Sequence, residues 1–134
     1  MYFLDTDICI YLLTGRVPEV ERRLRDVALN EIGTTAITAA ELRFGALKST
    51  RPRQNMARVE SFLSPLSLAA FDDRAAIHFA QLKAVLSKSG KLIGPMDLLI
   101  AAICLANKAT LVTNNIREFS RVPNLPVENW SKKA

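Results

Sequence analysis

The alternation of short apolar runs with longer amphipathic segments is the feature that most constrains the fold of this chain. Runs rich in apolar or β-branched residues predict strands at residues 2–4, 32–36, 66–71, 111–113 and 127–130. Helical spacing, with Pro, Thr or Asp near each start, predicts helices at 8–13, 18–29, 38–47, 53–63, 73–89 and 96–107. Strands that alternate with helices indicate a mainly parallel sheet covered on both faces. The expected fold class is therefore α/β, a single α/β/α sandwich over residues 1–134.

Length and composition restrict the class of protein. A chain of 134 residues with 49% hydrophobic and 23% charged residues suits one globular domain and argues against disorder. The longest apolar run, 98–106, is too short to cross a bilayer, and the N-terminus lacks the basic region of a signal peptide. We therefore expect a cytoplasmic protein without a membrane partner.

The few cysteine and histidine residues exclude several chemistries. Cys9 and Cys104 form no disulfide framework or zinc pattern and are expected to be small core residues. A single histidine, His78, argues against a His-centred triad or a multi-His zinc site, and we expect it to be partly exposed and structural. We expect Trp130 to pack at the close of the domain, with stacking on a nucleic-acid base as the alternative.

Basic residues occur in blocks within a chain of formal charge +5. Residues 43–58 hold five bases and no acid, and Lys83, Lys88 and Lys91 form a second block. Such blocks are typical of a surface that binds a polyanion, although a solvated helix face accounts for them equally well. The candidate RNA contacts are Arg43, Lys48, Arg51 and Arg53.

Acidic residues recur where predicted strands end and helices begin. Asp5 and Asp7 follow the first strand, Glu41 lies in the helix after the second, Asp97 opens an apolar helix, and Glu118 follows the strand at 111–113. In an open parallel sheet these positions converge on one edge, which is where ligands bind. Clustered carboxylates without His or Cys favour Mg²⁺, with Mn²⁺ also possible.

Each acid also has a purely structural interpretation. Glu41 could close a capping box at its own helix start, and Asp97 could complement a helix dipole. Asp5 or Asp7 could cap the first helix, and Glu118 could be a surface acid. These interpretations weaken jointly, because several buried like charges are costly unless a cation neutralises them. A basic protein with such a site predicts metal-dependent hydrolysis of phosphodiesters.

Four segments resemble the PIN-domain ribonucleases, and more narrowly the VapC toxins of bacterial type II toxin–antitoxin modules. They are LDTD at 4–7, TAAELRFGA at 38–46, GPMDLLIAA at 94–102 and TNNIREF at 113–119. The likeness runs in order along the whole chain and includes a closing VENW at 127–130. One such motif is weak evidence, whereas four in register are strong.

The resemblance implies a Mg²⁺-dependent endoribonuclease whose principal metal ligands are Asp5 and Asp97. Glu41 would complete the acidic cluster, directly or through a water molecule. Glu118 matches an acid that many relatives carry before the Phe of the last motif, whereas Asn115 stands where other relatives have Asp.

Two further site roles follow from the resemblance. Thr113 would orient a ligand or a water molecule rather than bind the metal. Asp7 stands where many relatives have Asn or Ser, so the first role that we expect for Asp7 is to cap the helix.

The resemblance also implies partners and a substrate. The family forms homodimers, is inhibited by a VapB antitoxin that can project a basic side chain into the acidic site, and binds operator DNA through the antitoxin. The motifs are similar to those of members that cleave the anticodon stem–loop of initiator tRNA, which would inhibit translation, whereas other members cut other tRNAs or ribosomal RNA. The helices at 8–13 and 53–63 are candidate surfaces for a dimer or an antitoxin.

Three other functions remain open from the sequence. A PIN nuclease of RNA processing or DNA repair would share the metal site and differ only in substrate. A catalytically silent nucleic-acid-binding regulatory module would be expected to lack one or more site acids, and a Mg²⁺-dependent phosphatase would gain nothing from the basic blocks.

Overall fold

The computed structural model describes residues 1–132 and is built on a sheet in which every strand pair is parallel. The strand order is β3-β2-β1-β4-β5. The strands are β1 (Tyr2–Leu4), β2 (Ile32–Thr35), β3 (Ser67–Ala69), β4 (Thr110–Val112) and β5 (Val127–Glu128). The order reverses beside β1, so the carboxyl ends of β1 and β4 form a switch point of the kind where α/β proteins bind ligands.

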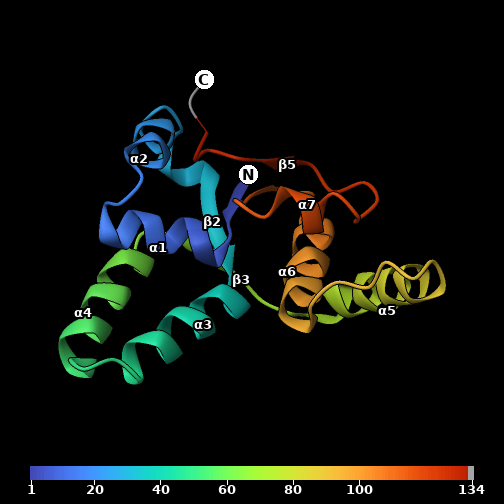
Figure 1. Cartoon of the computed structure of the whole chain (residues 1–134), viewed down its shortest axis with the longest axis horizontal. Coiled ribbons are helices and arrows are strands. Elements are labelled where there is room, and N and C mark those ends of the chain that lie inside the picture. Colours follow the sequence, from blue (N-terminus) through green and yellow to red (C-terminus); the bar gives the residue numbers. More distant parts are fainter. Residues whose placement is uncertain (133–134) are drawn as a thin grey trace.

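Helices cover both faces of the sheet, as the sequence predicts (Figure 1). On one side lie α1 (Thr6–Thr14), α2 (Pro18–Arg25), α3 (Ala36–Leu47) and α4 (Pro52–Leu63). On the other lie α5 (Asp73–Lys88), α6 (Pro95–Ala106) and α7 (Ile116–Phe119). The expected α/β/α sandwich is confirmed.

Strand alternation gives each face its own core. Leu4 and Val112 belong to the apolar cluster under α1, α2, α3 and α4, whereas Phe3 and Leu111 belong to the cluster under α5 and α6. Successive side chains of a strand point to opposite faces, so adjacent residues of β1 and β4 supply both layers. The register that pairs Phe3 with Leu111 and Leu4 with Val112 keeps each layer continuous.

Three helix boundaries differ from the sequence prediction by two residues or more. The helix predicted at 8–13 begins at Thr6, because Asp5 is its N-cap. The helix predicted at 38–47 begins at Ala36, because Thr35 is the N-cap and its side chain accepts a hydrogen bond from the Thr38 amide at 3.1 Å. The helix predicted at 18–29 ends at Arg25, and a 3₁₀ turn follows at Leu29–Glu31. The amide of Asp26 bonds the carbonyl of Arg23 at 3.2 Å, which tightens the last turn and ends the helix.

The strands and α7 hold further differences. The strand predicted at 66–71 covers only Ser67–Ala69. Helix α7 was not predicted, because four residues are too few to show a helical period. The last strand covers only Val127–Glu128, so Trp130 lies beyond it. The strand predicted at 111–113 is shifted by one residue to Thr110–Val112, which leaves Thr113 as the first residue after β4.

The sulfur and indole side chains lie where they were expected. Cys9 and Cys104 are both fully buried, and burial raises the pKa of each thiol. Trp130 is 1% exposed, which confirms its packing role and leaves no ring face for a base. His78 is partly exposed, as expected.

Within residues 1–132, no helix has the length and apolar character needed to span a membrane.

Candidate active site

Three consecutive residues after β4 each donate a hydrogen bond to a different carboxylate. The bonds run from Thr113 Oγ1 to Asp5 Oδ2 at 2.6 Å, from the Asn114 amide to Asp7 Oδ2 at 3.2 Å, and from Asn115 Nδ2 to Glu118 Oε2 at 2.6 Å. This loop, residues 113–115, is called the active-site loop below. It gathers acids from the start of α1 and from α7 at one edge of the sheet.

Asp5 lies directly after β1 and is the N-cap of α1. Its Oδ1 accepts from the Thr6 amide at 2.8 Å, and its Oδ2 accepts from Thr113. Burial, together with the charges of Asp7 and Glu41, raises the pKa of Asp5 to about 6, while the bonds from Thr113 and the Thr6 amide oppose the shift. Asp5 therefore both caps the helix and places a buried carboxylate at the site.

Asp7 is not the cap that the resemblance implied. It lies within the first turn of α1, where its Oδ1 accepts from the Ile8 amide at 2.7 Å. Its Oδ2 accepts from the Asn114 amide, and burial raises its pKa. Asp7 therefore ties α1 to the active-site loop.

Asp97 and Glu118 meet at the start of α6. Asp97 lies in the first turn of that helix, and Glu118 Oε1 accepts from the Gly94 amide at 2.8 Å. A Cβ atom added at Gly94 would lie 3.7 Å from Glu118 Oε1 and 3.8 Å from Asp97 Oδ2. Glu118 is thus part of the acidic cluster, and its interpretation as a surface acid is wrong.

The proximity of these two acids changes how readily each ionises. Burial and the neighbouring Glu118 carboxylate raise the pKa of Asp97 to about 7. The bond from the Gly94 amide lowers the pKa of Glu118. Of the two acids, Glu118 is therefore the one that stays ionised more readily, and Asp97 is the one that binds a proton more readily.

Glu41 is held by a threonine at the start of α1. Thr6 Oγ1 donates to Glu41 Oε1 at 2.6 Å, so Glu41 does not turn back to its own helix start. The capping-box interpretation is therefore wrong. The charge of Glu41 raises the pKa of both Asp5 and Asp97, which places it in the same electrostatic cluster.

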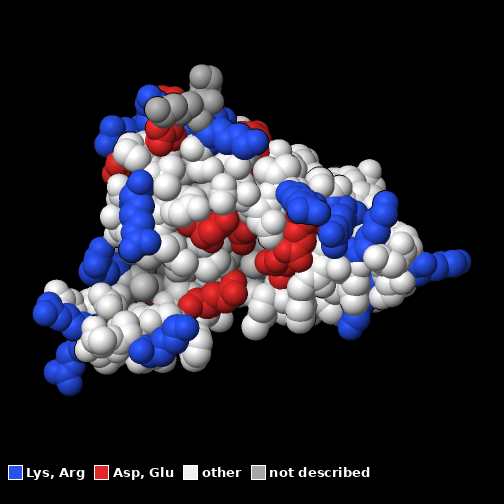
Figure 2. Space-filling model, viewed as in Figure 1, with Lys and Arg blue, Asp and Glu red and all other residues white. Residues whose placement is uncertain are grey.

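No basic residue of the described chain forms an ion pair with this cluster. The ion pairs present join Arg43 to Glu60 and Arg23 to Glu128. Figure 2 shows the acids gathered in the middle of one face, with Lys and Arg around its border. Carboxylates gathered in this way, without an ion-paired base, are the donor set that a hard divalent cation neutralises.

The carboxylates do not form a closed metal cage. Residues 1–132 contain no group of three or more His, Cys, Asp or Glu side chains placed to hold an ion together. Mg²⁺ in proteins is commonly held by one or two carboxylates with water and substrate phosphate as further ligands, and an open acidic cluster suits that mode.

The predicted RNA contacts lie between the second half of α3 and the start of α4. Arg43 is engaged by Glu60, with Nε to Oε1 at 2.6 Å and Nη2 to Oε2 at 3.2 Å. Lys48 lies 5.2 Å above the Phe44 ring centroid, whereas Arg51 and Arg53 are exposed at the start of α4. The structure therefore does not bring these bases into the acidic cluster.

Sequence reasoning missed three contributors to the site: Thr6, Gly94 and Asn114. Each lies inside one of the four motifs, so the motifs were the available signal. Their parts depend on which backbone amide or hydroxyl meets which carboxylate, and this is a tertiary property.

Residues 2–125 match the PIN domain family, and the chain therefore belongs to it. Within that family it belongs to the VapC ribonucleases. It is 41% identical to ribonuclease VapC2 of Rickettsia felis over 98% of this chain and 99% of the relative. It is 45% identical to ribonuclease VapC2 of Haemophilus influenzae, over 96% of this chain and 97% of the relative. It is 38% identical to the tRNA(fMet)-specific endonuclease VapC of Salmonella typhimurium, over the same shares of the two chains.

A solved structure agrees with this assignment. The fold is similar to that of one chain in the crystal structure of VapBC2 from Rickettsia felis bound to a DNA fragment from its promoter, with a TM-score of 0.90 and 40% identity. The match covers 96% of this chain and 98% of that chain.

Proposed function

We propose that this chain is a Mg²⁺-dependent endoribonuclease toxin that cleaves a tRNA and so inhibits translation. The observation that carries the proposal is the cluster of Asp5, Glu41, Asp97 and Glu118 at the carboxyl edge of the sheet, with which no Lys or Arg among residues 1–132 forms an ion pair. The Salmonella relative acts on tRNA(fMet), so the anticodon loop of initiator tRNA is the first substrate to test.

The residues of the cluster divide the work. Asp5 and Asp97 would hold Mg²⁺, with Mn²⁺ as a substitute, and Glu41 and Glu118 would act as further ligands or bond its water molecules. Mg²⁺ would supply polarisation of the phosphoryl group and a water of lowered pKa. Thr113 fixes the Asp5 carboxylate, and Asn115 fixes Glu118.

The proposed partner is a VapB-type antitoxin, through which the complex binds operator DNA. Related solved structures are VapBC complexes, and two of them contain DNA. An acidic cluster without a basic partner of its own suits inhibition by a basic side chain of the antitoxin. A homodimer is part of the same proposal.

Cleavage of a total tRNA pool with Mg²⁺ tests the activity. Wild type is compared with Asp5→Asn and Asp97→Asn, which keep side-chain shape and remove the charge. Asp73→Asn is the matched control, because Asp73 is an exposed acid in the first turn of another helix, α5. We expect one discrete product with wild type and control, and a rate at least about 100-fold lower in both site variants or with EDTA.

The other outcomes separate the remaining functions. No cleavage by folded, antitoxin-free wild type would exclude tRNA and direct the search to ribosomal RNA. Binding of RNA that is never cut would support a silent regulatory module. Cleavage that survives EDTA would contradict the metal-dependent mechanism.

A further inference from the structure

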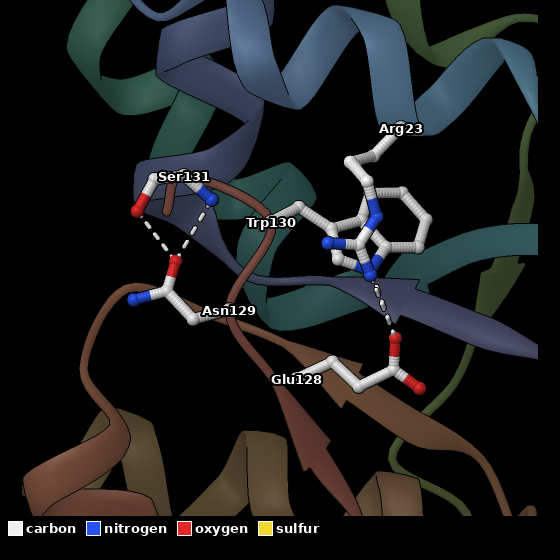
Figure 3. A network of polar contacts seen from close by, with 5 residues as sticks. All are labelled: Arg23, Glu128, Asn129, Trp130 and Ser131. Atoms are coloured by element: carbon white, nitrogen blue, oxygen red, sulfur yellow. Dashed lines mark hydrogen bonds and ion pairs between the residues drawn. The ribbon is translucent and has the colours of Figure 1, made fainter. Parts of the chain in front are cut away.

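The C-terminal residues 127–131 are anchored to the body of the fold by aromatic, hydrogen-bond and ion-pair contacts. Trp130 is buried, its ring centroid lies 5.4 Å from that of Tyr2, and its Nε1 donates to Glu128 Oε1 at 3.0 Å. The Arg23 side chain comes from α2. Its Cζ lies 5.8 Å from the Trp130 ring centroid, and its Nη2 lies 3.6 Å from Glu128 Oε1 (Figure 3). This anchor fixes residues 127–131 against β1 and α2.

From that anchor, two polar side chains reach the active-site loop. Asn129 Nδ2 donates to Asn114 Oδ1 at 3.3 Å, and Ser131 Oγ lies 2.9 Å from the same oxygen. Asn129 Oδ1 accepts from the backbone amide of Ser131 at 2.8 Å, which holds the Asn129 side chain against the backbone of Ser131 (Figure 3). The Ser131 hydroxyl is within reach of both amide oxygens and donates to one at a time.

Asn114 uses its remaining polar groups on the other side of the loop. Its Nδ2 donates to Tyr11 Oη at 3.3 Å, and its amide donates to Asp7 Oδ2. Asn114 is thus the one residue of the active-site loop whose side chain faces the C-terminal segment, while its neighbours Thr113 and Asn115 bond Asp5 and Glu118.

We propose that residues 127–131 form a C-terminal brace that fixes the active-site loop and thereby positions Asp5 and Glu118. The brace holds the loop at two points, the Thr113 amide, which donates to the Glu128 carbonyl at 3.0 Å, and the Asn114 side chain. Asn114 is a positioning residue, because it touches neither carboxylate and acts through its two neighbours in the loop. The effect of the brace on cleavage rests on the proposed function, whereas its effect on the loop does not.

Hydrogen–deuterium exchange tests the brace without metal or RNA. In the double variant Asn129→Ala/Ser131→Ala, we expect faster exchange in the peptide that covers residues 113–119 and unchanged exchange in α5. Asn107→Ala is the control, because Asn107 Nδ2 bonds the Ile103 carbonyl at 2.8 Å and lies at the far end of α6 from Asp97. Unchanged exchange in the loop peptide of the double variant would overturn the proposal.

A mutant cycle tests the link to the site. Calorimetric titration with Mg²⁺ alone should show a roughly threefold to tenfold weaker affinity for Asn114→Ala and for the double variant, as expected for residues that support metal ligands. Combining all three changes should weaken affinity no further than Asn114→Ala does, because the side chains of Asn129 and Ser131 reach the loop through Asn114. In cleavage assays kcat should fall while KM for the RNA stays unchanged.

The outcomes separate the brace from the proposed function. Additive losses of Mg²⁺ affinity, or losses equal to those of Asn107→Ala, would contradict a positioning role. If the loop exchanges faster in the double variant but wild type binds no Mg²⁺ and cuts no RNA, the proposed function fails and the brace stands as a loop support.

Discussion

Asp5 shows how one residue combines a structural and a chemical role. As an N-cap it satisfies the Thr6 amide, and as a buried carboxylate it faces three other acids at the edge of the sheet. The cap fixes the carboxylate by a local bond, and the sequence had left Asp5 and Asp7 as alternatives for this role. The second oxygen is fixed by Thr113, which is 108 residues away in the chain.

Burial of Asp5 predicts a stability that falls as pH rises in the metal-free protein. The pKa is about 6 when folded against 3.8 for the free side chain, so the folded state binds the proton more tightly. The contribution is complete below pH 3.8 and is lost as pH rises through about 6, a change on the order of 3 kcal/mol. Asp97 acts in the same direction, and Glu118, whose pKa is lowered, acts in the opposite direction.

Denaturant unfolding in EDTA between pH 4 and 7.5 measures this loss. Adding Mg²⁺ should restore stability at pH 7.5 and have little effect at pH 4.5, because the cation binds the ionised carboxylates. The same series on Asp5→Asn should show a weaker dependence on pH. A metal-free protein that gains stability towards pH 7.5 would contradict this account of the buried acid.

At the scale of elements, the close approach of β2 and β3 depends on one glycine. A Cβ atom at Gly33 would lie 2.7 Å from the Ser67 carbonyl oxygen of the neighbouring strand and 3.2 Å from the Phe3 ring. Neither contact can be relieved by a flexible side chain, since one atom is backbone and the other belongs to a buried ring. Gly33 therefore sets how β3 joins the sheet.

Substitution of two glycines by alanine should have opposite effects. Gly33→Ala should lower the free energy of unfolding by about 1–3 kcal/mol, because the strand pair must separate. Gly45→Ala in α3 should raise it by about 0.5–1 kcal/mol, because nothing lies within 4 Å of the new methyl group and alanine favours helix. Urea unfolding of the two variants decides this, and equal effects would refute the packing argument for Gly33.

At the scale of the whole molecule, one face has acids gathered at its centre and most of its Lys and Arg towards the border (Figure 2). This separation suits an RNA substrate whose scissile phosphate meets the acids while flanking phosphates meet bases. The two basic blocks lie on different parts of the fold, because the α3–α4 turn belongs to one layer and α5 to the other (Figure 1). The structure also weakens the case for Arg43, whose guanidinium is bonded to Glu60.

The salt dependence of tRNA binding distinguishes these surfaces. In an Asp97→Asn background, Arg51→Ala/Arg53→Ala should reduce the slope of log affinity against log salt by about 0.7–0.9 for each phosphate that is no longer neutralised. Arg43→Ala should change the slope less, because its charge is already paired. Lys83→Ala/Lys88→Ala on α5 is the matched control, and a larger effect there would move the RNA-binding surface to the other layer.

The sequence alone determined the layer architecture and predicted the four acids, Asp5, Glu41, Asp97 and Glu118, that the fold brings to one edge of the sheet. Periodicity predicts strands and helices because it reflects which side chains must be buried, and acids after strand ends converge in any parallel sheet. The four motifs added the family. Boundaries failed where a local bond outweighed the pattern, as at Thr35, and where an element was as short as α7.

Only the tertiary structure decided how these acids are held. Thr6 takes Glu41 away from its own helix start, the Gly94 amide draws Glu118 to Asp97, and Asn114 links the active-site loop to the C-terminal brace. The physical reason is that a hydrogen bond between residues far apart in sequence depends on distance and direction in the folded chain. Sequence spacing reports neither of these. It therefore predicts which residues lie at the site, but not which of them bond to one another.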